Sequence, residues 1–274
     1  MKLVIFTTCK PFINDDSWRQ EQAIKSWTLL EGIEKEILIM GNDKGVKEIC
    51  DKYNLKHISE VKCFNGIPYV DSMFEIAASY ANENDILMWT NSDIIFFNDL
   101  IENIFYFSNN FTKNNIKNYL LTGQRYDWIN PNILNDFSKE NFIKNSHINS
   151  NVTEDIYNLE SKNHEIGLHP PCGIDYIIHS KTTIKDFLQK GLVIAGTRHD
   201  MILLGIGIIN KMFTCDITNS NFIIHQNHEY RYTNVKNLEV LKNNNLKIKG
   251  IQKSISECPY KTFLNNNNIH IKKI

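Results

Sequence analysis

This 274-residue chain lacks a strong net charge of either sign, because its 30 Lys and Arg residues are balanced by 31 Asp and Glu residues. The formal net charge is −1 and the sequence contains no basic run, which argues against a dedicated nucleic-acid-binding protein. Long apolar runs are missing as well. The longest, residues 201–209, is far shorter than the ~20 residues that a membrane-spanning helix needs, so we expect no transmembrane segment.

Close cysteine pairs are also absent. The spacing of the six cysteines fits neither a zinc cage nor a disulfide framework, and we expect free, mostly buried thiols at Cys9, Cys50, Cys63, Cys172, Cys215 and Cys258. The apolar stretch at residues 1–6 is too short for a signal peptide and suits a buried strand. We therefore expect a cytoplasmic protein with one main domain, built around the core that 42% hydrophobic residues allow.

Strand and helix patterns alternate clearly in the first half of the chain. Short apolar runs predict strands, and apolar residues spaced three and four apart predict the helices between them. The predicted strands are residues 3–7, 36–40, 57–60, 85–90 and 119–122, with helices between successive strands. For the first helix, Ser17 and Gln20 form a capping-box pattern. Repeated β-α-β units predict an α/β fold with one Rossmann-like, mostly parallel sheet flanked by helices.

The second half of the chain is less regular. Residues 130–165 are rich in Asn and polar, which indicates an insertion or flexible loop with one helix around residues 133–142. Beyond it we expect a strand through His179, helices near residues 183–190 and after Gly196, and strands at residues 213–217 and 222–225. Residues 233–274 read as a C-terminal helix and a tail.

Polar turns follow three of the predicted strands: Thr7-Thr8, Asn42-Asp43 and Asn91-Ser92-Asp93. The carboxyl ends of parallel strands lie at one edge of a sheet, and ligands of α/β proteins bind at that edge. We therefore expect the three turns to converge on one site.

Asn91-Ser92-Asp93 lies between a buried strand and the apolar run of residues 94–97. A carboxylate at such a position is costly to desolvate unless it is paired. A divalent cation that bridges a diphosphate would provide the pairing, because Mg²⁺ and Mn²⁺ prefer carboxylate and phosphate oxygens. The alternative is an Asp that caps the helix near Asn98.

Four further residues have both a functional and a structural interpretation. His225 and His228 leave a predicted strand together and could approach one site, or one could lie in the core and the other in solvent. Asp200 stands at a helix start, either as an N-cap or as a general base for an acceptor hydroxyl. Asp175 could pair at a strand edge or bind an acceptor.

The order of several short segments resembles a group of GT-A-fold glycosyltransferase-like proteins. The resemblance covers roughly residues 1–232, with gaps at the insertion, and its most specific parts are Asn91-Ser92-Asp93 and the block His225-Gln226-Asn227-His228-Glu229-Tyr230. The other matching segments are residues 7–12, 19–20, 23–27 and 173–176. The resemblance implies a catalytic domain at residues 1–232, with a nucleotide-sugar-binding half at 1–125 and an acceptor-binding half at 126–232.

The resemblance also implies roles for individual residues. Asp93 would bind Mn²⁺ or Mg²⁺ as the last acidic residue of the GT-A Asp-x-Asp motif does, with Asn91 in place of the first, and His225 or His228 would complete the metal site. Residues that would line the pocket for a nucleotide-diphosphate-sugar, with UDP-sugars favoured, are Thr7, Thr8, Arg19, Asn42, Asp71, Ser72, Asn91 and Ser92. Asp200 would be the base, with Asp175 near the acceptor.

Together these interpretations predict a glycosyltransferase of hexosyltransferase type that acts in glycan biosynthesis. It would transfer a sugar to a glycan or other hydroxyl acceptor, with inversion if Asp200 is the base and with retention if no carboxylate reaches the acceptor. A sugar-nucleotide nucleotidyltransferase is one alternative, but its Gly-rich phosphate loop is missing, because residues 7–12 contain no glycine. A second alternative is a domain that binds nucleotide or glycan without catalysis, which the replacement of a carboxylate by Asn91 would allow. The sequence does not determine the sugar, the acceptor or the oligomeric state.

Overall fold

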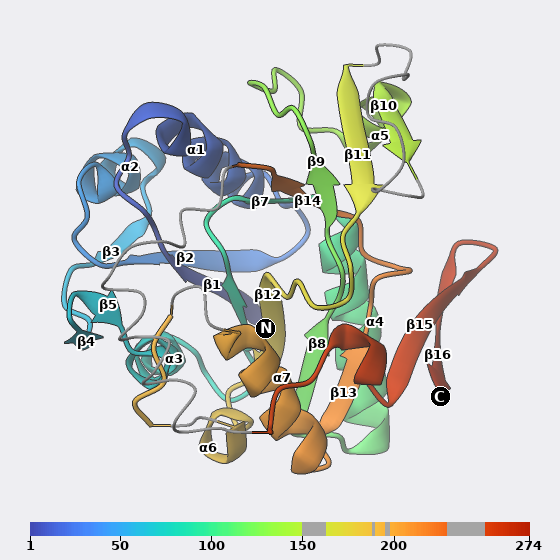
Figure 1. The fold of residues 1–274 in the computed structure, drawn as a ribbon. Coiled ribbons are helices and arrows are strands. Elements are labelled where there is room, and N and C mark those ends of the chain that lie inside the picture. Colours follow the sequence, from blue (N-terminus) through green and yellow to red (C-terminus); the bar gives the residue numbers. More distant parts are fainter. Residues whose placement is uncertain (150–162, 188–189, 195–197, 229–249) are drawn as a thin grey trace.

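The computed structural model describes residues 1–149, 163–187, 190–194, 198–228 and 250–274. Its largest feature is a nine-stranded sheet in the order β16-β15-β13-β8-β12-β6-β1-β2-β3 (Figure 1). In that order the strands are Asn268–Lys273, Tyr260–Asn265, Phe213–Asp216, Tyr119–Thr122, Tyr176–Ser180, Ile86–Thr90, Lys2–Thr8, Glu34–Met40 and Lys56–Ile58. Neighbouring strands are parallel except where β12 meets β6 and β8 and where β16 meets β15. The predicted α/β class with a large, mostly parallel sheet is therefore confirmed.

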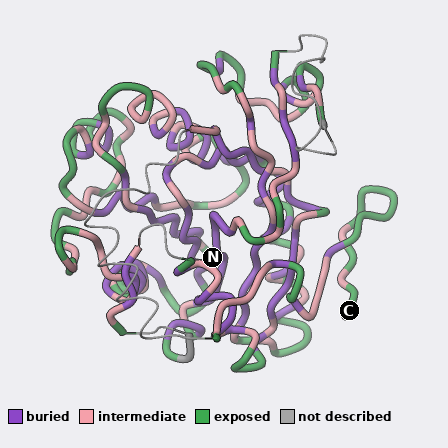
Figure 2. Tube along the Cα trace, in the orientation of Figure 1, coloured by how far each residue is buried: buried purple, intermediate pink, exposed green. Residues whose placement is uncertain are grey.

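Helices cover both faces of this sheet. On one face lie α1 (Asn14–Thr28), α2 (Val46–Tyr53) and α4 (Asp99–Asn114), and on the other lie α3 (Val70–Ser79), α6 (Ile184–Phe187) and α7 (His199–Ile209). Successive side chains of β1 point to opposite faces of the sheet. Leu3 and Ile5 pack with the helices of the first face, and Val4 and Phe6 pack with those of the second. Figure 2 shows that the middle strands of the sheet are buried, whereas much of the β15–β16 hairpin is exposed.

A second sheet of five strands stands beside the first, and the sequence analysis did not predict it. Its order is β10-β11-β9-β14-β7, with strands Ser146–Asn149, His164–Leu168, Tyr126–Trp128, Ile223–Gln226 and Ile94–Phe96. Trp27 of α1 joins the two sheets, because its indole Nε1 donates to the carbonyl oxygen of Ile94 at 2.8 Å. The short strands β4 (Cys63–Phe64) and β5 (Ile67–Pro68) pair with each other.

The region predicted as an insertion is partly regular in the structure. Its described part contributes β10 and β11 to the second sheet, and a helix, α5, spans Lys139–Lys144, instead of residues 133–142. The helix begins where Ser138 caps it, its hydroxyl accepting a hydrogen bond from the Asn141 backbone. Phe142 anchors α5 in a small core with Trp128 and Ile166, so much of this polar region belongs to the folded body.

Two other expectations differ from the structure. The described part of the predicted C-terminal helix and tail is a 3-10 turn at Ile255–Glu257 followed by the β15–β16 hairpin, which extends the main sheet beside β13. The rest of that prediction falls on residues 233–249, outside the described residues.

Ser17 and Gln20 do not cap α1, because the helix begins at Asn14 and Ile13 is its N-cap. None of the helices in the described part of the chain has the length and apolarity to cross a membrane.

Candidate functional site

The turn Asn91-Ser92-Asp93 carries the chain from one sheet to the other. It follows β6 of the main sheet and precedes β7 of the second sheet. The Asn91 backbone N–H donates to the Asp175 carbonyl at 2.8 Å, and the Asn91 amide donates to the Asp175 carboxylate at 2.6 Å. These two bonds fix the start of the turn, so Asn91 serves as an anchor to β12 while Asp93 projects where the two sheets meet.

Strand β14 brings both predicted histidines to Asp93. β14 pairs with β7 and β9 on its two sides, so that His225 is aligned with Ile94 and with Asp127. Oδ2 of Asp93 lies 3.7 Å from Nε2 of His225 and 3.1 Å from Nε2 of His228. One ligand atom from each of the three residues lies within 4.8 Å of the others, a spacing that could hold a metal ion.

The electrostatics of Asp93 differ from those of a helix cap. α4 has Asn98 as its N-cap, while the Asp93 carboxylate faces the histidines. Burial raises the pKa of Asp93, but the His228 hydrogen bond and the charges of His225 and Lys10 together hold that pKa well below its ordinary value. Oδ1 of Asp93 is buried without a hydrogen-bond partner. A charged, buried oxygen without a partner is the kind of group that a bound cation satisfies.

Asp127 orients the deeper histidine, a role that the sequence analysis missed. Its Oδ1 accepts from Nδ1 of His225 at 2.9 Å, and its Oδ2 accepts from Nδ1 of His169 at 2.6 Å. Arg125 Nε also donates to Oδ1 at 2.9 Å. Burial raises the pKa of Asp127, but the bonds from His169 and His225 and the charge of Arg125 lower it far more. Asp127 is therefore an anion that can only accept, so this bond places a proton on Nδ1 of His225 and leaves Nε2 as the nitrogen that faces Asp93 and could bind a metal.

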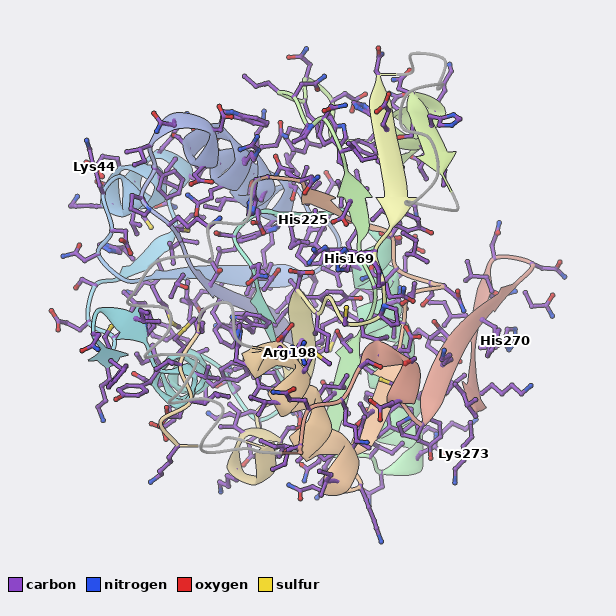
Figure 3. The ribbon with its side chains drawn as sticks, in the orientation of Figure 1. Lys44, His169, Arg198, His225, His270 and Lys273 are labelled. Atoms are coloured by element: carbon purple, nitrogen blue, oxygen red, sulfur yellow. The ribbon has the colours of Figure 1, made fainter. Side chains whose placement is uncertain are left out.

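Arg125 links Asp127, which orients His225, to Asp175. Its Nη1 makes a buried ion pair with Asp175, while its Nε contacts Asp127. Figure 3 shows His225 and His169 in the middle of the molecule, with Arg198 at the start of α7 below them. The signal for these missed residues was weak: Arg125 directly precedes β9 and lies two residues before Asp127, a spacing that places two side chains on one face of an extended chain.

Asp200 lies on the Asp175 side of this network, in the first turn of α7. Burial, together with the charge of Asp175, raises the pKa of Asp200 to about 7, while the Met201 and Ile174 backbones lower it in part. The neighbouring His199 is buried, and burial lowers its pKa to about 4, so its ring is neutral. A carboxyl group with a pKa near 7 can exchange a proton at neutral pH.

Gln20 and Gln226 hold the segments around Asp93 in place. The Gln20 amide makes both hydrogen bonds to the Lys10 backbone, at 2.7 and 3.0 Å, and accepts from the Ser92 hydroxyl at 2.8 Å. Gln226 Nε2 donates to the carbonyls of Arg19 and Asp93. The backbone of Lys10 is thereby fixed, and its Nζ lies 3.4 Å from Nε2 of His228.

The other residues predicted for the nucleotide pocket are spread along the same edge of the main sheet. Thr7 and Thr8 end β1, in register with Ile39 and Met40 of β2, and Asn42 follows β2 in an exposed turn. Asp71 and Ser72 lie at the start of α3, where their hydrogen bonds go to the backbones of Gly191 and Lys62. The structure thus brings Asp93 into direct contact with His225 and His228, whereas Asn91 bonds to Asp175 and Ser92 bonds to Gln20. Asp71 and Ser72 make their hydrogen bonds elsewhere. The last two residues of the His225–Tyr230 block lie outside the described residues.

No protein-family model matches the chain, and no curated protein sequence matches it. Among solved structures, the chain is similar to S. aureus TarS 1–349, with 12% identity and a TM-score of 0.46 over 84% of this chain and 59% of that one. TarS 1–349 in complex with UDP-GlcNAc gives 10% identity and a TM-score of 0.48 over 94% and 70%. The inositol-1-phosphate CTP transferase from T. maritima gives 8% identity and a TM-score of 0.45 over 92% and 98%. The chain thus spans about 59% of the length of the first of these.

Proposed function

We propose that the chain is a divalent-metal-assisted glycosyltransferase that uses a nucleotide-diphosphate-sugar donor and a hydroxyl acceptor. The observation that supports this best is the Asp93–His225–His228 cluster, whose ligand atoms lie within 4.8 Å of one another at the junction of the two sheets. Asp93 and His228 keep 14% and 13% of their side-chain surface exposed, so the cluster can be reached from solvent.

The donor set fits a metal ion. It consists of the Asp93 carboxylate and two imidazoles. The carboxylate stays ionised and its Oδ1 has no hydrogen-bond partner, and the tautomer of His225 is set by Asp127. Imidazole nitrogen suits transition metals better than Mg²⁺, so we propose Mn²⁺ as the resident ion. Two histidines and one carboxylate can also bind Fe²⁺, and a metal titration therefore has to include it. When bound, the metal would neutralise the charge that develops on a departing diphosphate.

Cationic groups beside the cluster favour an anionic ligand. Lys10 Nζ lies 3.4 Å from Nε2 of His228, and half of the Lys10 side chain is exposed. Arg19 lies on α1, where its backbone carbonyl accepts from Gln226 at 2.8 Å, and its side-chain Nε is buried without a hydrogen-bond partner. In our proposal, Lys10 and Arg19 bind the diphosphate oxygens and so hold the leaving group in place, which is electrostatic stabilisation of the transition state.

Asp200 is our proposed base for an inverting transfer. Its pKa of about 7 allows the carboxylate to accept the acceptor hydroxyl proton as that oxygen attacks the anomeric carbon. Asp175 is less suited to the same task, because its carboxylate accepts from Asn91 and forms an ion pair with Arg125. We propose that Asp175 orients Asn91 and Arg125 and raises the pKa of Asp200.

Nucleotide binding in the presence and absence of metal tests the proposal. Thermal-shift titrations with UDP, UDP-sugars and other nucleotide diphosphates should show stabilisation that depends on Mn²⁺, about 2.7 kcal/mol at a hundredfold excess over Kd. Asp93→Ala should abolish the Mn²⁺-dependent part, while Asp51→Ala on the exposed surface of α2 serves as the matched control. If Asp93→Ala binds and transfers like the wild type, the metal assignment is wrong.

A donor-hydrolysis assay separates the proposal from a domain that binds without catalysis. A transferase should release the nucleoside diphosphate slowly in the absence of acceptor and faster with acceptor, whereas a binding domain should release none. A nucleotidyltransferase would instead release pyrophosphate from a nucleoside triphosphate, so measuring both products distinguishes the three functions.

A further inference from the structure

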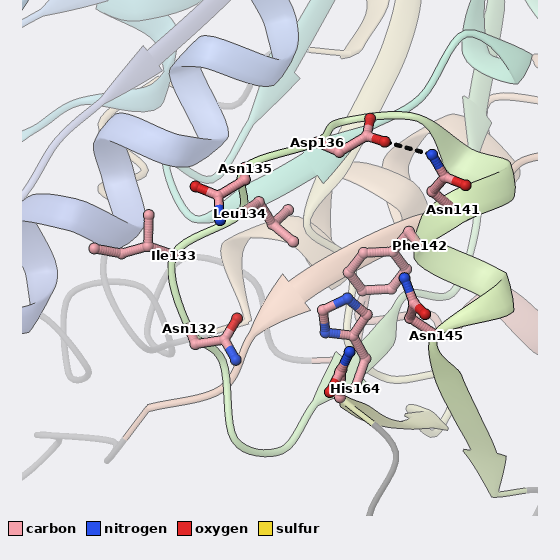
Figure 4. Close-up of a pocket in the computed structure, with 10 residues that line it drawn as sticks. Asn132, Ile133, Leu134, Asn135, Asp136, Asn141, Phe142, Asn145 and His164 are labelled. Atoms are coloured by element: carbon pink, nitrogen blue, oxygen red, sulfur yellow. Dashed lines mark hydrogen bonds between the residues drawn. The ribbon is translucent and has the colours of Figure 1, made fainter.

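A cavity of about 350 Å³ opens between α5 and the loop that precedes it, and it is lined by residues 132–136, 141–142, 145 and 163–164. Figure 4 shows Asn132, Leu134 and Asn135 on the loop side and Asn141, Phe142 and Asn145 on the helix side, with the His164 ring between them. Its volume is at the lower end of the range for small-ligand pockets, about 300–1,000 Å³.

The lining of this cavity favours a neutral ligand that is rich in hydroxyl groups. Amide side chains predominate, and no Lys or Arg is among the residues that line it. The one carboxylate, Asp136, already accepts from the Ser138 backbone and the Asn141 amide. Without a cationic group the cavity has no charge to balance a phosphate or a carboxylate, whereas amides can donate and accept toward neighbouring sugar hydroxyls.

An unsatisfied buried imidazole lies in the wall of the cavity. His164 is 7% exposed, and its Nδ1 is buried without a hydrogen-bond partner. Burial lowers the pKa of His164 more than the Asn163 backbone raises it, so the ring is neutral. The ring is fixed, because it stacks on Phe142 with centroids 4.3 Å apart and meets the edge of Trp128 at 4.7 Å. Trp128 Nε1 is also buried without a partner. A buried polar atom without a partner needs an explanation, and one explanation is a partner that a bound molecule or water supplies.

The cavity is distinct from the cluster at Asp93. Asp127 and Trp128 are adjacent on β9 and therefore point to opposite faces of the second sheet, Asp127 toward His225 and Trp128 toward Phe142. One residue nevertheless connects the two places. Gln22 accepts from the Leu134 backbone at 2.6 Å and donates to the Asn132 carbonyl at 3.1 Å and to the Gln226 side chain at 2.8 Å.

We propose that this cavity binds a neutral sugar unit of a glycan and so forms a second carbohydrate site apart from the transfer centre. The identification of that glycan as the acceptor rests on the proposed function, but the binding itself does not. The site would hold a distant unit of the acceptor chain while another unit is placed at Asp93. The hydrogen-bond path through Gln22 would keep the two sites at a constant separation.

Isothermal titration with uncharged trisaccharides of glucose and of N-acetylglucosamine, without metal or nucleotide, tests the binding. The wild type should bind at least one of them saturably in the millimolar range or tighter. Asn132→Ala removes only a side chain, since the backbone carbonyl of Asn132 makes the bond to Gln22. His164→Phe keeps the stacking on Phe142 but removes both ring nitrogens. Each variant should weaken binding roughly tenfold or more, while Asn109→Ala on the exposed surface of α4 should not change it.

Two results would overturn the proposal: no saturable binding of either trisaccharide by the wild type, or equal affinity in wild type, Asn132→Ala and His164→Phe. Melting temperatures of the variants show whether a loss of binding reflects unfolding, and Asn132→Ala covers the case in which His164→Phe does not fold. A wild type that binds the trisaccharide but shows no Mn²⁺-dependent nucleotide binding would contradict the proposed transferase function and leave the carbohydrate site standing.

Discussion

The carboxylate of Asp127 accepts a hydrogen bond from Nδ1 of His225 at 2.9 Å, which fixes the proton of that imidazole on the side away from Asp93. The second nitrogen, Nε2, faces the Asp93 carboxylate 3.7 Å away and is the nitrogen that could bind a metal. Carboxylate–histidine pairs of this type set ligand orientation and basicity in metal sites. Asp127 therefore acts on the cluster through His225, without being one of its three members.

Asp127→Asn should weaken Mn²⁺ binding about 10- to 100-fold, because an amide can hold the ring in either tautomer and contributes no charge. Calorimetric titration with Mn²⁺ measures this directly. Asp51→Asn, which changes an exposed carboxylate on α2, is the matched control and should bind Mn²⁺ like the wild type. Unchanged Mn²⁺ affinity in Asp127→Asn would show that Asp127 does not set the tautomer of His225.

The same carboxylates should give the fold a dependence on acid. The folded state holds the pKa values of Asp93 and Asp127 well below the ordinary value near ~3.9. A group with a lowered folded pKa contributes stability above its unfolded pKa, and that contribution is lost as pH falls below about 4. The melting temperature of the wild type should therefore approach that of Asp127→Asn on acidification. A difference that stays constant from pH 7 to about 3 would contradict this assignment.

Lys10 should contribute to nucleotide affinity rather than to metal affinity. Its ammonium group lies 3.4 Å from Nε2 of His228, and its backbone is anchored by two bonds to Gln20. A hydrogen bond to a charged group contributes about 1.5–3 kcal/mol, so Lys10→Ala should weaken UDP binding roughly 10- to 100-fold. Lys44→Ala, at an exposed position after β2, is the control. The reverse pattern, with Mn²⁺ affinity lost and UDP affinity kept, would place Lys10 outside the diphosphate site.

Gly205 should be required for the packing of the C-terminal segment on α7. A Cβ atom added at Gly205 would lie 1.7 Å from the carbonyl oxygen of Ile251, a backbone atom that cannot rotate away. Gly205→Ala should therefore cost about 1–3 kcal/mol, and each kcal/mol lowers Tm by about 2–4 °C in a chain of this size. Calorimetry measures the Tm of Gly205→Ala. The control is Ile209→Ala, which alters the exposed end of the same helix. An unchanged Tm would mean that residues 250–258 do not pack closely on α7.

The first half of the fold could be predicted from sequence because its signals are local. Apolar runs and helical stripes near Val46 and Ile86 follow from side-chain periodicity, and β-α-β order leaves few arrangements of parallel strands. The second sheet has no such signal. Its strand β9 is three residues long and pairs with β14, about a hundred residues later in the chain. The pattern at residues 260–273 is weak too, because Lys and Asn separate its few apolar residues.

The candidate site could also be predicted from the sequence only in part. Asp93, His225 and His228 were recognisable as chemically capable residues, and the structure brings all three together. Arg125 and Asp127 were missed because their importance comes from partners on β14 and β12, which only the tertiary fold supplies. Gln20 was assigned to a helix cap from its spacing to Ser17, but its amide holds the Lys10 backbone. Spacing patterns describe local structure and do not report contacts between distant segments.

Asp200→Asn should separate catalysis from stability. A base must be deprotonated, so the wild-type kcat/KM should fall as pH decreases below about 7, the pKa of Asp200. The variant should keep its affinity for the donor while transfer falls about 10²- to 10⁴-fold. Its amide oxygen can still accept from the backbone of Ile174 and Met201, which interact with the carboxylate.

Asp200→Asn should lower transfer activity but raise the stability of the fold. Because burial raises the folded pKa of Asp200 to about 7 from an unfolded value near ~3.9, the fold loses stability as pH rises between these values. Asp200→Asn removes this titration, so the variant should be more stable than the wild type by up to ~4 kcal/mol above pH ~7 and nearly equal to it near pH ~4. Chemical denaturation at the two pH values measures the difference. A variant that is less stable at high pH, or one that loses donor affinity together with transfer, would show that Asp200 supports the structure and is not the base.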